Sequence, residues 1–265
     1  MKLYSNEEDI ILLQDVLKKA GDISLQYFKK TVKMWLKDDK SPVSESDIAV
    51  NKFLYDNLMT ARPNYGWISE ESDVFIKKGE HTERTFVVDP IDGTRGFLKH
   101  DPHWCISVAI SQGDKIVSGA IYCPVLGELY HSVLHGGVYK NGSLIDEYVI
   151  KKDKCVVSIP TQIIDDVKDK VPDDIVLYPY VPSLAYKIIL CVIGVVDIVV
   201  IRPSCKIWDI AAADLMLRSS GGCLVDYDGN KISYDKPEYH TKYLFAYKNI
   251  EQFKDLAIEL KDIIS

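Results

Sequence analysis

Apolar residues recur at helical spacing in the first part of the chain. Ser5 and Glu8 make a capping-box sequence, and apolar residues then follow at intervals of three and four, which predicts an amphipathic helix over 6–29. Similar spacing predicts a second helix over 44–61, which a proline follows. The charged, proline-containing stretch 37–42 between the two helices is expected to form a loop.

Apolar runs of strand length fill the next part of the chain. They cover 65–69, 85–88, 105–111, 116–123, 129–134 and 137–145. The last run contains Asn141-Gly142, a dipeptide that favours a tight hairpin turn. Because most of these runs are joined by short turns, we expect a mostly antiparallel sheet that packs against the first two helices.

Strands and helices alternate in the remainder of the chain. The predicted strands cover 155–159, 175–178, 197–201 and 244–247, and the predicted helices cover 163–171, 183–195, 208–219 and 251–264. Such alternation is typical of a layered α/β arrangement. We therefore expect an N-terminal α+β half, residues 1–150, and a C-terminal α/β half, residues 151–265, that share a broad interface.

The composition limits the kinds of protein that this chain can be. With 265 residues, 47% of them hydrophobic, it can bury a large core, and its net charge of −7 argues against a nucleic-acid polymer or an anionic membrane as the main partner. Polar residues 5–9 interrupt any signal peptide, and the longest apolar run, 188–201, is too short to span a membrane. We therefore expect a cytoplasmic protein. Its six cysteines form no C-x-x-C pair and are expected to be buried free thiols.

The hexapeptide Asp89-Pro90-Ile91-Asp92-Gly93-Thr94 follows a predicted buried strand. A turn there can aim the two aspartates and the Ile91 carbonyl at one point, and a point surrounded by hard oxygen atoms suits Mg²⁺ or a similar cation. Gly93 lets the backbone approach a ligand closely. The amides of Gly93 and Thr94 open the next segment, where a phosphate group can meet a helix N-terminus.

Three further acidic residues stand at the borders of predicted elements. Glu70 follows a strand, whereas Asp47 and Asp209 lie near the starts of helices. Each of these alone would more commonly be a solvated or capping residue. Their occurrence in one chain with the hexapeptide 89–94 favours a shared site instead.

Together these segments resemble the inositol monophosphatase superfamily of Mg²⁺-dependent, Li⁺-sensitive phosphatases. The matching motifs are Glu70-Glu71-Ser72, the hexapeptide 89–94, and 208–212 (Trp-Asp-Ile-Ala-Ala) followed by Gly221-Gly222, and they occur in the order typical of that family. The resemblance spans nearly the whole chain. It implies an alternating αβαβα sandwich, and such proteins are commonly homodimers.

The resemblance also implies which residues hold metal ions. The first Mg²⁺ would be bound by Glu70, Asp89 and the backbone carbonyl of Ile91. The second would be bound by Asp89, Asp92 and Asp209, and Glu70 would help to hold a weaker third ion. Two cations, and a third in some states, are therefore expected.

Catalytic and substrate-binding roles follow from the same resemblance. Asp47 and Thr94 would orient and deprotonate the attacking water, and Glu70 shares the catalytic role. The residues expected to contact the substrate are Asp92, Gly93, Thr94, Lys37, Ser183, Arg202 and Asp209. The partner implied is a small phosphorylated molecule, with no nucleic-acid polymer and no membrane.

The identity of the phosphate ester depends on a few residues outside the motifs. Inositol-selective members of the superfamily carry an acidic residue seven positions before the aspartate of the Trp-Asp motif, and this chain has Arg202 there. A guanidinium group only donates hydrogen bonds, so it suits a second phosphate or a carboxylate better than a polyol. Lys37 and the turn around Ser183 resemble the bacterial branch that includes 3'(2'),5'-bisphosphate nucleotidases.

We therefore expect a phosphomonoester hydrolase acting on 3'-phosphoadenosine 5'-phosphate or a similar bisphosphate. One alternative is a phosphatase of inositol 1-phosphate or of another sugar phosphate, because the shared fold leaves substrate choice to loop residues. An alternative of a different class is a metal-binding regulatory protein that docks a transcription partner.

Overall fold

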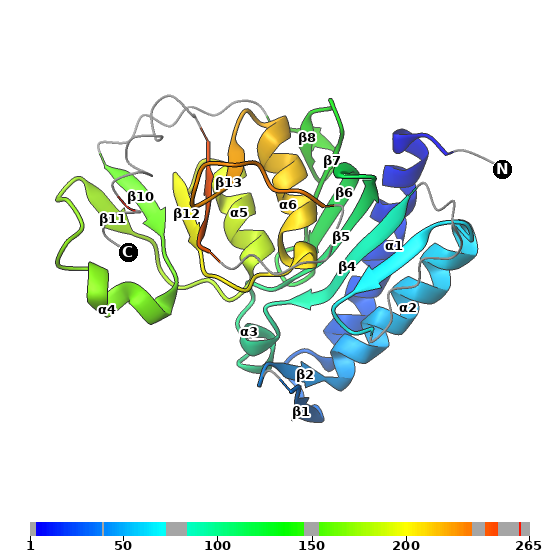
Figure 1. Cartoon of the computed structure of the whole chain (residues 1–265). Coiled ribbons are helices and arrows are strands. Elements are labelled where there is room, and N and C mark those ends of the chain that lie inside the picture. The colour runs from blue at the N-terminus through cyan, green and yellow to red at the C-terminus, as the bar shows by residue number, and fades with distance from the viewer. Residues whose placement is uncertain are drawn as a thin grey trace.

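The computed structural model describes residues 4–38, 40–72, 84–145, 154–234, 242–248 and 260. The two large sheets of the described residues alternate with helical layers through the molecule (Figure 1). From right to left in that view lie α1 and α2, a seven-stranded sheet, α5 and α6, a five-stranded sheet, and α4. The expected αβαβα sandwich is confirmed.

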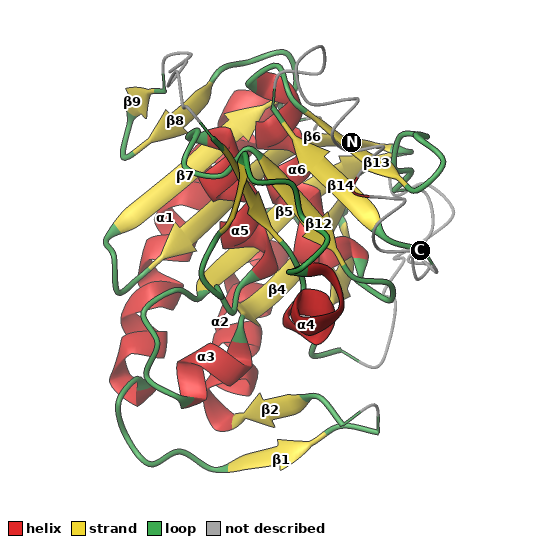
Figure 2. Cartoon of the chain, turned by 90° about the vertical axis from the view of Figure 1, so that its left-hand side faces the viewer, coloured by secondary structure: helices red, strands yellow, loops and turns green. Residues whose placement is uncertain are grey.

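The first layer contains the two predicted N-terminal helices, α1 (Asn6–Tyr27) and α2 (Glu45–Ala61). The capping box of α1 is formed, since the Glu8 amide donates to the Ser5 hydroxyl over 3.1 Å and the Ser5 amide donates to the Glu8 carboxylate over 2.8 Å. Between the helices the structure adds a small antiparallel hairpin of β1 (Met34–Leu36) and β2 (Pro42–Ser44), which the sequence analysis missed. Figure 2 shows this hairpin at one end of the molecule, beside α3 (Thr94–Leu98).

The seven-stranded sheet has the strand order β3-β4-β5-β6-β7-β8-β9. Its strands are β3 (Gly66–Ser69), β4 (Thr85–Asp92), β5 (Cys105–Gln112), β6 (Lys115–Cys123), β7 (Glu128–Val133), β8 (Val138–Lys140) and β9 (Ser143–Leu144). All neighbours pair antiparallel except β3 and β4, so the mostly antiparallel arrangement is confirmed. The predicted turn at Asn141-Gly142 joins β8 to β9.

Side chains of β4 alternate between two cores. Phe86 and Val88 pack toward α1 and α2, whereas Val87 between them belongs to the core that contains α5 and α6. All three are buried, which explains why this strand reads as a continuous apolar run. Packing on both faces fixes the strand, and it therefore also holds the acidic residues at the end of the strand in place.

The third layer consists of α5 (Leu184–Val192) and α6 (Ile207–Ser219). Small residues let α6 approach the sheet closely: a Cβ atom added to Gly119 of β6 would lie only 3.1 Å from the Cα atom of Ala212. Larger side chains at either position would push the helix away from the sheet. The alanines that follow Asp209 therefore set the depth at which that residue sits.

The five-stranded sheet has the order β11-β10-β12-β14-β13. Its strands are β10 (Cys155–Ser158), β11 (Ile175–Leu177), β12 (Ile198–Ile201), β13 (Cys223–Asp226) and β14 (Leu244–Tyr247). The sequence analysis missed β13, and the helix that it expected over 163–171 is shorter, with a 3₁₀ turn η1 (Thr161–Ile163) leading into α4 (Ile164–Val167). The helix expected over 251–264 lies outside the described residues apart from Leu260. The division of the chain at residue 150 stays a prediction.

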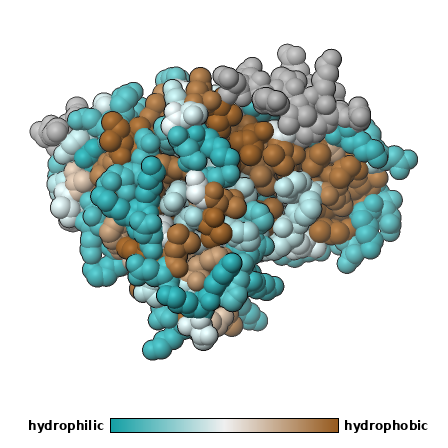
Figure 3. Space-filling view, turned by 180° about the vertical axis from the view of Figure 1, so that it is seen from behind, coloured by the Kyte–Doolittle hydropathy of each residue, from teal (hydrophilic) through white to brown (hydrophobic). Residues whose placement is uncertain are grey.

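The outer side of the five-stranded sheet has its own apolar core, in which Val167 of α4 and Leu260 pack with residues of the strands. Figure 3 shows apolar residues grouped over this end of the molecule when it is seen from behind. All six cysteines are free thiols, as expected, and four of them are buried. Among the helices that the structure describes, none combines the length and apolar character needed to cross a lipid bilayer.

Candidate active site

A cavity of about 630 Å³ opens where the end of β4 faces the start of α5, the end of β12 and the start of α6. Eight of the residues singled out from the sequence line it, namely Glu70, Asp89, Ile91, Asp92, Gly93, Thr94, Arg202 and Asp209. They come from both the N-terminal and the C-terminal parts of the chain. The fold therefore brings most of the predicted site into one place.

The β4 strand is longer than the predicted 85–88 and includes the acidic residues that were expected to form a turn. It runs to Asp92, which still pairs with Cys105 of β5 after an irregularity that begins at Asp89. Within this bulge the Ile91 amide donates to the Asp89 carboxylate over 3.0 Å. The two aspartates are thus held by the sheet itself and do not depend on a free loop.

Gly93 turns the chain from β4 into α3. Its φ of +96° lies in the region that glycine adopts most readily, and a Cβ atom added there would be 3.1 Å from the amide nitrogen of Ser183. A side chain at this position would strain the backbone and press against the turn before α5. The glycine therefore permits close contact between the two parts of the chain at the cavity.

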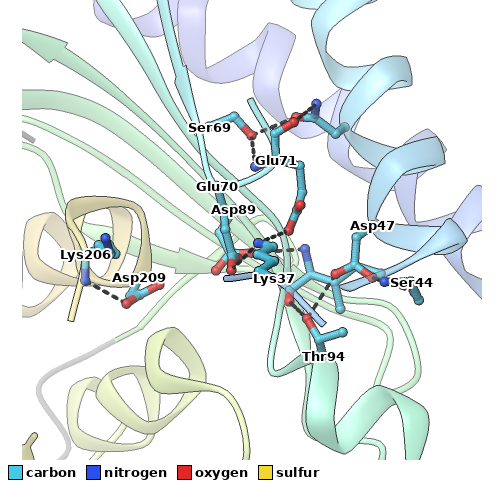
Figure 4. A network of polar contacts seen from close by, with 12 residues as sticks. Lys37, Ser44, Asp47, Ser69, Glu70, Glu71, Asp89, Thr94, Lys206 and Asp209 are labelled. Carbon is cyan, nitrogen blue, oxygen red and sulfur yellow. Dashed lines mark hydrogen bonds and ion pairs between the residues drawn. The ribbon is translucent and has the colours of Figure 1, made fainter. Parts of the chain in front are cut away.

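Asp47 and Thr94 are joined directly, as Figure 4 shows. The Thr94 hydroxyl lies 2.9 Å from a carboxylate oxygen of Asp47 and 3.1 Å from the Ile91 carbonyl oxygen. The other Asp47 oxygen accepts hydrogen bonds from the amide and the hydroxyl of Ser44. Burial raises the pKa of Asp47 to about 6, although these hydrogen bonds act to lower it.

Asp92 is held by the beginning of α5. The Ser183 hydroxyl and the Ala185 amide each donate to one Asp92 oxygen over 2.6 Å, and the Leu184 amide donates to the other over 3.2 Å. Burial raises the pKa of Asp92 to about 6 against these bonds. Ser183 has no exposed surface and caps α5, and its hydroxyl is hydrogen-bonded to Asp92 and to the Tyr186 amide. Its expected contact with the substrate stays a prediction.

Asp89 and Asp209 lie near several other carboxylates. Burial and the charges of Glu70, Asp92 and Asp209 raise the pKa of Asp89 well above its usual range. Burial and the charges of Asp92 and Glu70 do the same for Asp209, even though the Lys206 amide donates to its carboxylate over 2.8 Å. Carboxylates that repel one another in a buried place favour the binding of a cation.

Lys37 is bound to the acidic pair at the end of β3. Its ammonium group lies 3.0 Å from Glu70 and 2.6 Å from Glu71 (Figure 4). Burial acts to lower the pKa of Lys37, but the two carboxylates outweigh it and raise the pKa overall. Lys37 does not line the cavity, so the structure places it beside Glu70 and not in the expected position against the substrate.

The oxygen ligands expected for Mg²⁺ line one cavity. Within the described residues no three acidic, histidine or cysteine side chains converge as a metal-binding group. Lys37 neutralises Glu70, and backbone and hydroxyl donors hold Asp92 and Asp209. The donor set of carboxylates and one carbonyl nevertheless fits a hard divalent cation, and burial and neighbouring negative charges hold the pKa of Asp89 well above its usual range.

Four cationic or aromatic residues in the cavity wall were missed by the sequence analysis: Arg95, Lys99, Tyr180 and Lys187. Arg95 directly follows the hexapeptide, so proximity along the chain was a usable signal. Lys187 lies three positions after Leu184 on α5, and both side chains line the cavity, as residues at that helical spacing share a face. Tyr180 lies in the segment before α5, and no pattern in the sequence marked it.

Comparison with known proteins places the chain in a family. The family model described as "Inositol monophosphatase family" matches residues 5–260. An inositol monophosphatase from Dictyostelium discoideum is 30% identical over 237 residues, which cover 82% of this chain and 84% of that protein. The 3'(2'),5'-bisphosphate nucleotidase CysQ from Aggregatibacter actinomycetemcomitans is 26% identical over 238 residues, which cover 86% of this chain and 88% of that protein.

The fold has close relatives among solved structures. An IMPase/NADP phosphatase in complex with Mg²⁺ and phosphate superposes with a TM-score of 0.81, covering 98% of this chain and 96% of that chain at 20% identity, which supports the shared fold. The family match extends over nearly the whole chain and includes every motif described above. The chain therefore belongs to the inositol monophosphatase family and is a phosphomonoester hydrolase.

Proposed function

We propose that this protein is a Mg²⁺-dependent phosphatase of a bisphosphorylated small molecule, with 3'-phosphoadenosine 5'-phosphate as the first candidate. The observation that carries the proposal is the group of carboxylates that face one cavity beside the Thr94–Asp47 hydrogen bond: Asp89 and Asp92, which are buried, and Asp209, which is half-buried. Such an arrangement suits a reaction in which an anionic ester must meet an oxygen nucleophile.

The proposed metal ligands are those that the family resemblance implied. Glu70, Asp89 and the Ile91 carbonyl would hold one Mg²⁺, and Asp89, Asp92 and Asp209 a second, with Glu70 near a weaker third. When bound, Mg²⁺ supplies positive charge that lowers the pKa of water and neutralises phosphoryl oxygens. For Glu70 to take part, its carboxylate has to be shared with, or released by, Lys37.

The pair Thr94 and Asp47 is proposed to move the proton of the attacking water. The Thr94 hydroxyl already donates toward Asp47, so its oxygen can accept the proton of a water molecule as its own proton passes to the carboxylate. The water oxygen then forms a bond to phosphorus while the ester P–O bond breaks, and the alcohol leaves with a proton from solvent. The amides of Gly93 and Thr94 are proposed to hold the phosphoryl oxygens.

The choice of a bisphosphate rests on Arg202. Its exposed side chain lines the same cavity as the acidic residues, where a second phosphate of a bound substrate would be within its reach. A relative that is 26% identical is named as a 3'(2'),5'-bisphosphate nucleotidase, which supports this substrate class. The guanidinium group of Arg202 can pair with a phosphate through two parallel hydrogen bonds.

Inositol 1-phosphate, or another sugar phosphate, is the second candidate substrate. It is favoured by the 30% identity to a protein named inositol monophosphatase, the higher of the two identities described above. Against it stands the absence of an acidic group at position 202, where a polyol hydroxyl would need an acceptor.

A comparison of substrates tests the proposal. The rates of hydrolysis of 3'-phosphoadenosine 5'-phosphate, inositol 1-phosphate, fructose 1,6-bisphosphate and histidinol phosphate are measured side by side with Mg²⁺. We expect the first to be hydrolysed fastest, and Arg202→Glu to shift the preference toward the polyol ester. Fastest hydrolysis of inositol 1-phosphate by the wild-type protein would overturn the assignment of Arg202.

Three further properties are proposed: inhibition by Li⁺ and a homodimeric state, from the family resemblance, and a cytoplasmic location, from the sequence. The first is tested by adding LiCl to the phosphatase assay, and the second by light scattering on the purified protein. A monomer of 30.0 kDa in solution would contradict the second.

A further inference from the structure

The wall of the cavity carries four positive side chains in addition to its acids: Arg95, Lys99, Lys187 and Arg202. Among the residues that the structure describes, none of the four lies within ion-pair distance of an acidic side chain. In a protein with a net charge of −7, four cations without an ion pair around one cavity indicate that the occupant brings negative charge of its own.

Lys187 is the most informative of these cations because it is not at the surface. It is half-buried on α5, one helical turn after the Ser183 cap that holds Asp92. Burial lowers the pKa of Lys187, the charge of Asp92 acts to raise it and that of Arg202 to lower it further. Lys187, Asp92 and Arg202 all line the cavity, and an ammonium group without an ion pair is costly to bury unless a ligand compensates it.

Tyr180 presents an aromatic ring at the same place. It is 55% exposed, an unusual state for a large aromatic side chain, and it lines the cavity. The Lys187 ammonium lies 5.9 Å from the centre of the ring. Exposed aromatic rings next to cations are surfaces on which planar groups such as nucleobases stack.

We propose that Tyr180, Lys187 and Arg202 form a subsite that binds the non-reacting part of a nucleotide substrate, with the two cations on its second phosphate and the ring against its base. The proposal rests on the proposed function, since it assumes that the reacting phosphate is at the carboxylates. It adds two residues to Arg202 and narrows the substrate from any bisphosphate to one with a planar aromatic part.

A simpler explanation for Lys187 is that it only balances the charge of Asp92. In that case its removal would impair the hydrolysis of every phosphate ester to the same degree, because Asp92 belongs to the proposed metal site. A subsite for a second phosphate instead affects only substrates that have one. The two explanations are separated by a pair of substrates that differ in that group alone.

The experiment compares kcat/KM for 3'-phosphoadenosine 5'-phosphate, which is adenosine 3',5'-bisphosphate, with kcat/KM for adenosine 3'-monophosphate. In Lys187→Gln we expect the bisphosphate value to fall about tenfold or more, because a hydrogen bond between charged groups is lost, while the monophosphate value changes less than about twofold. Lys187→Arg should restore most of the loss. Lys115→Gln, which removes the same charge from an exposed position outside the cavity, should leave both values unchanged.

Tyr180→Leu tests the aromatic part. It should lower kcat/KM for both adenosine substrates by about tenfold, because stacking of a base on an aromatic ring is lost, and leave fructose 1,6-bisphosphate unaffected. An equal loss on all three substrates would overturn the stacking role. Thermal unfolding of each variant shows whether the protein is still folded.

Equal effects of Lys187→Gln on the two adenosine substrates, or no preference of the wild-type protein between them, would overturn the subsite. Fastest hydrolysis of inositol 1-phosphate would contradict only the proposed substrate, since the two nucleotides still report on the subsite. If no ester is hydrolysed, the proposed function fails. Calorimetric titration with the same two nucleotides then tests the subsite. The subsite requires that the wild-type protein binds the bisphosphate more tightly than the monophosphate and that Lys187→Gln does not.

Discussion

The hydroxyl of Ser183 donates a hydrogen bond of 2.6 Å to Asp92, which lies 91 positions earlier in the chain. This bond joins the first turn of α5 to the end of β4, and the Leu184 and Ala185 amides reinforce it. Asp92 is thus oriented by a helix from the other part of the molecule. Ser183, which the sequence analysis placed against the substrate, holds a proposed metal ligand in position.

Removal of this hydroxyl should weaken metal binding more than it alters substrate choice. We expect Ser183→Ala to raise the Mg²⁺ concentration needed for half-maximal activity by about 10- to 100-fold, as is typical when a partner of a metal ligand is lost. Activity as a function of Mg²⁺ concentration measures this. Ser132→Ala, which removes a buried hydroxyl from β7, is the matched control. An unchanged Mg²⁺ requirement in Ser183→Ala would contradict the positioning role.

Thr94 and Asp47 should act as a single unit. We expect Asp47→Asn and Thr94→Val each to lower kcat by about 10² to 10⁴-fold, because either change interrupts proton transfer from the attacking water. Thr94→Ser keeps the hydroxyl and should retain most of the activity. Because both residues serve one step, the double variant should be no slower than the slower single variant. Losses that multiply in the double variant would show that the two residues act independently.

The pH dependence of the reaction should report the charge of Asp47. A proton acceptor has to be ionised, and burial raises the pKa of Asp47 to about 6. We therefore expect kcat/KM to rise with pH and to level off near or below pH 6, because bound cations shift the ionisation downward. Rates measured between about pH 4.5 and 8 at saturating Mg²⁺ test this. A rate that falls as pH rises through this range would be inconsistent with Asp47 as the acceptor.

A buried acid outside the cavity should make folding stability depend on pH. Asp214 on α6 accepts a hydrogen bond from Tyr234 over 2.7 Å and lies 3.0 Å from Arg218, yet burial raises its pKa from 3.8 to about 6. The folded state therefore holds this proton more tightly than the unfolded state. Its contribution to the free energy of unfolding is complete below about pH 4 and is lost as pH rises to about 6.

The variant Asp214→Asn isolates that contribution. Between about pH 4 and pH 6, the free energy of unfolding should fall less in the variant than in the wild-type protein. The difference should be as much as about 3 kcal/mol, for a shift of about two pKa units. Urea unfolding at about pH 4 and pH 6.5 provides both free energies. An identical pH dependence in the two proteins would show that Asp214 is ionised in the folded state at both values.

The sequence predicted the elements whose apolar spacing is regular. The capping box at Ser5, the hairpin at Asn141-Gly142 and the layered arrangement are all found. It missed β1 and β2, because three-residue strands are too short to create a pattern, and every side chain of β1 is exposed as well. It also ended β4 too early, since the bulge lets an aspartate- and proline-containing segment remain paired to β5.

The site residues that belong to sequence motifs were predictable. Five of the six residues 89–94 line one cavity together with Glu70 and Asp209, and the metal-binding roles expected for this site stay predictions. The partners of individual side chains were not predictable, because a hydroxyl such as that of Ser183 can face either a ligand or the protein. Lys37 illustrates the same limit, since its sequence position gave no sign that Glu70 and Glu71 would bind it.

The most direct test of the central claim is Mg²⁺-dependent release of inorganic phosphate by the wild-type protein and by Asp89→Asn. Asp89 is proposed to bridge both cations, so the variant keeps its size but loses the charge that holds them. We expect hydrolysis that requires Mg²⁺ in the wild-type protein and a loss of at least about 10³-fold in the folded variant. Undiminished hydrolysis by Asp89→Asn, or hydrolysis by the wild-type protein that persists with excess chelator, would contradict the proposed metal-dependent mechanism.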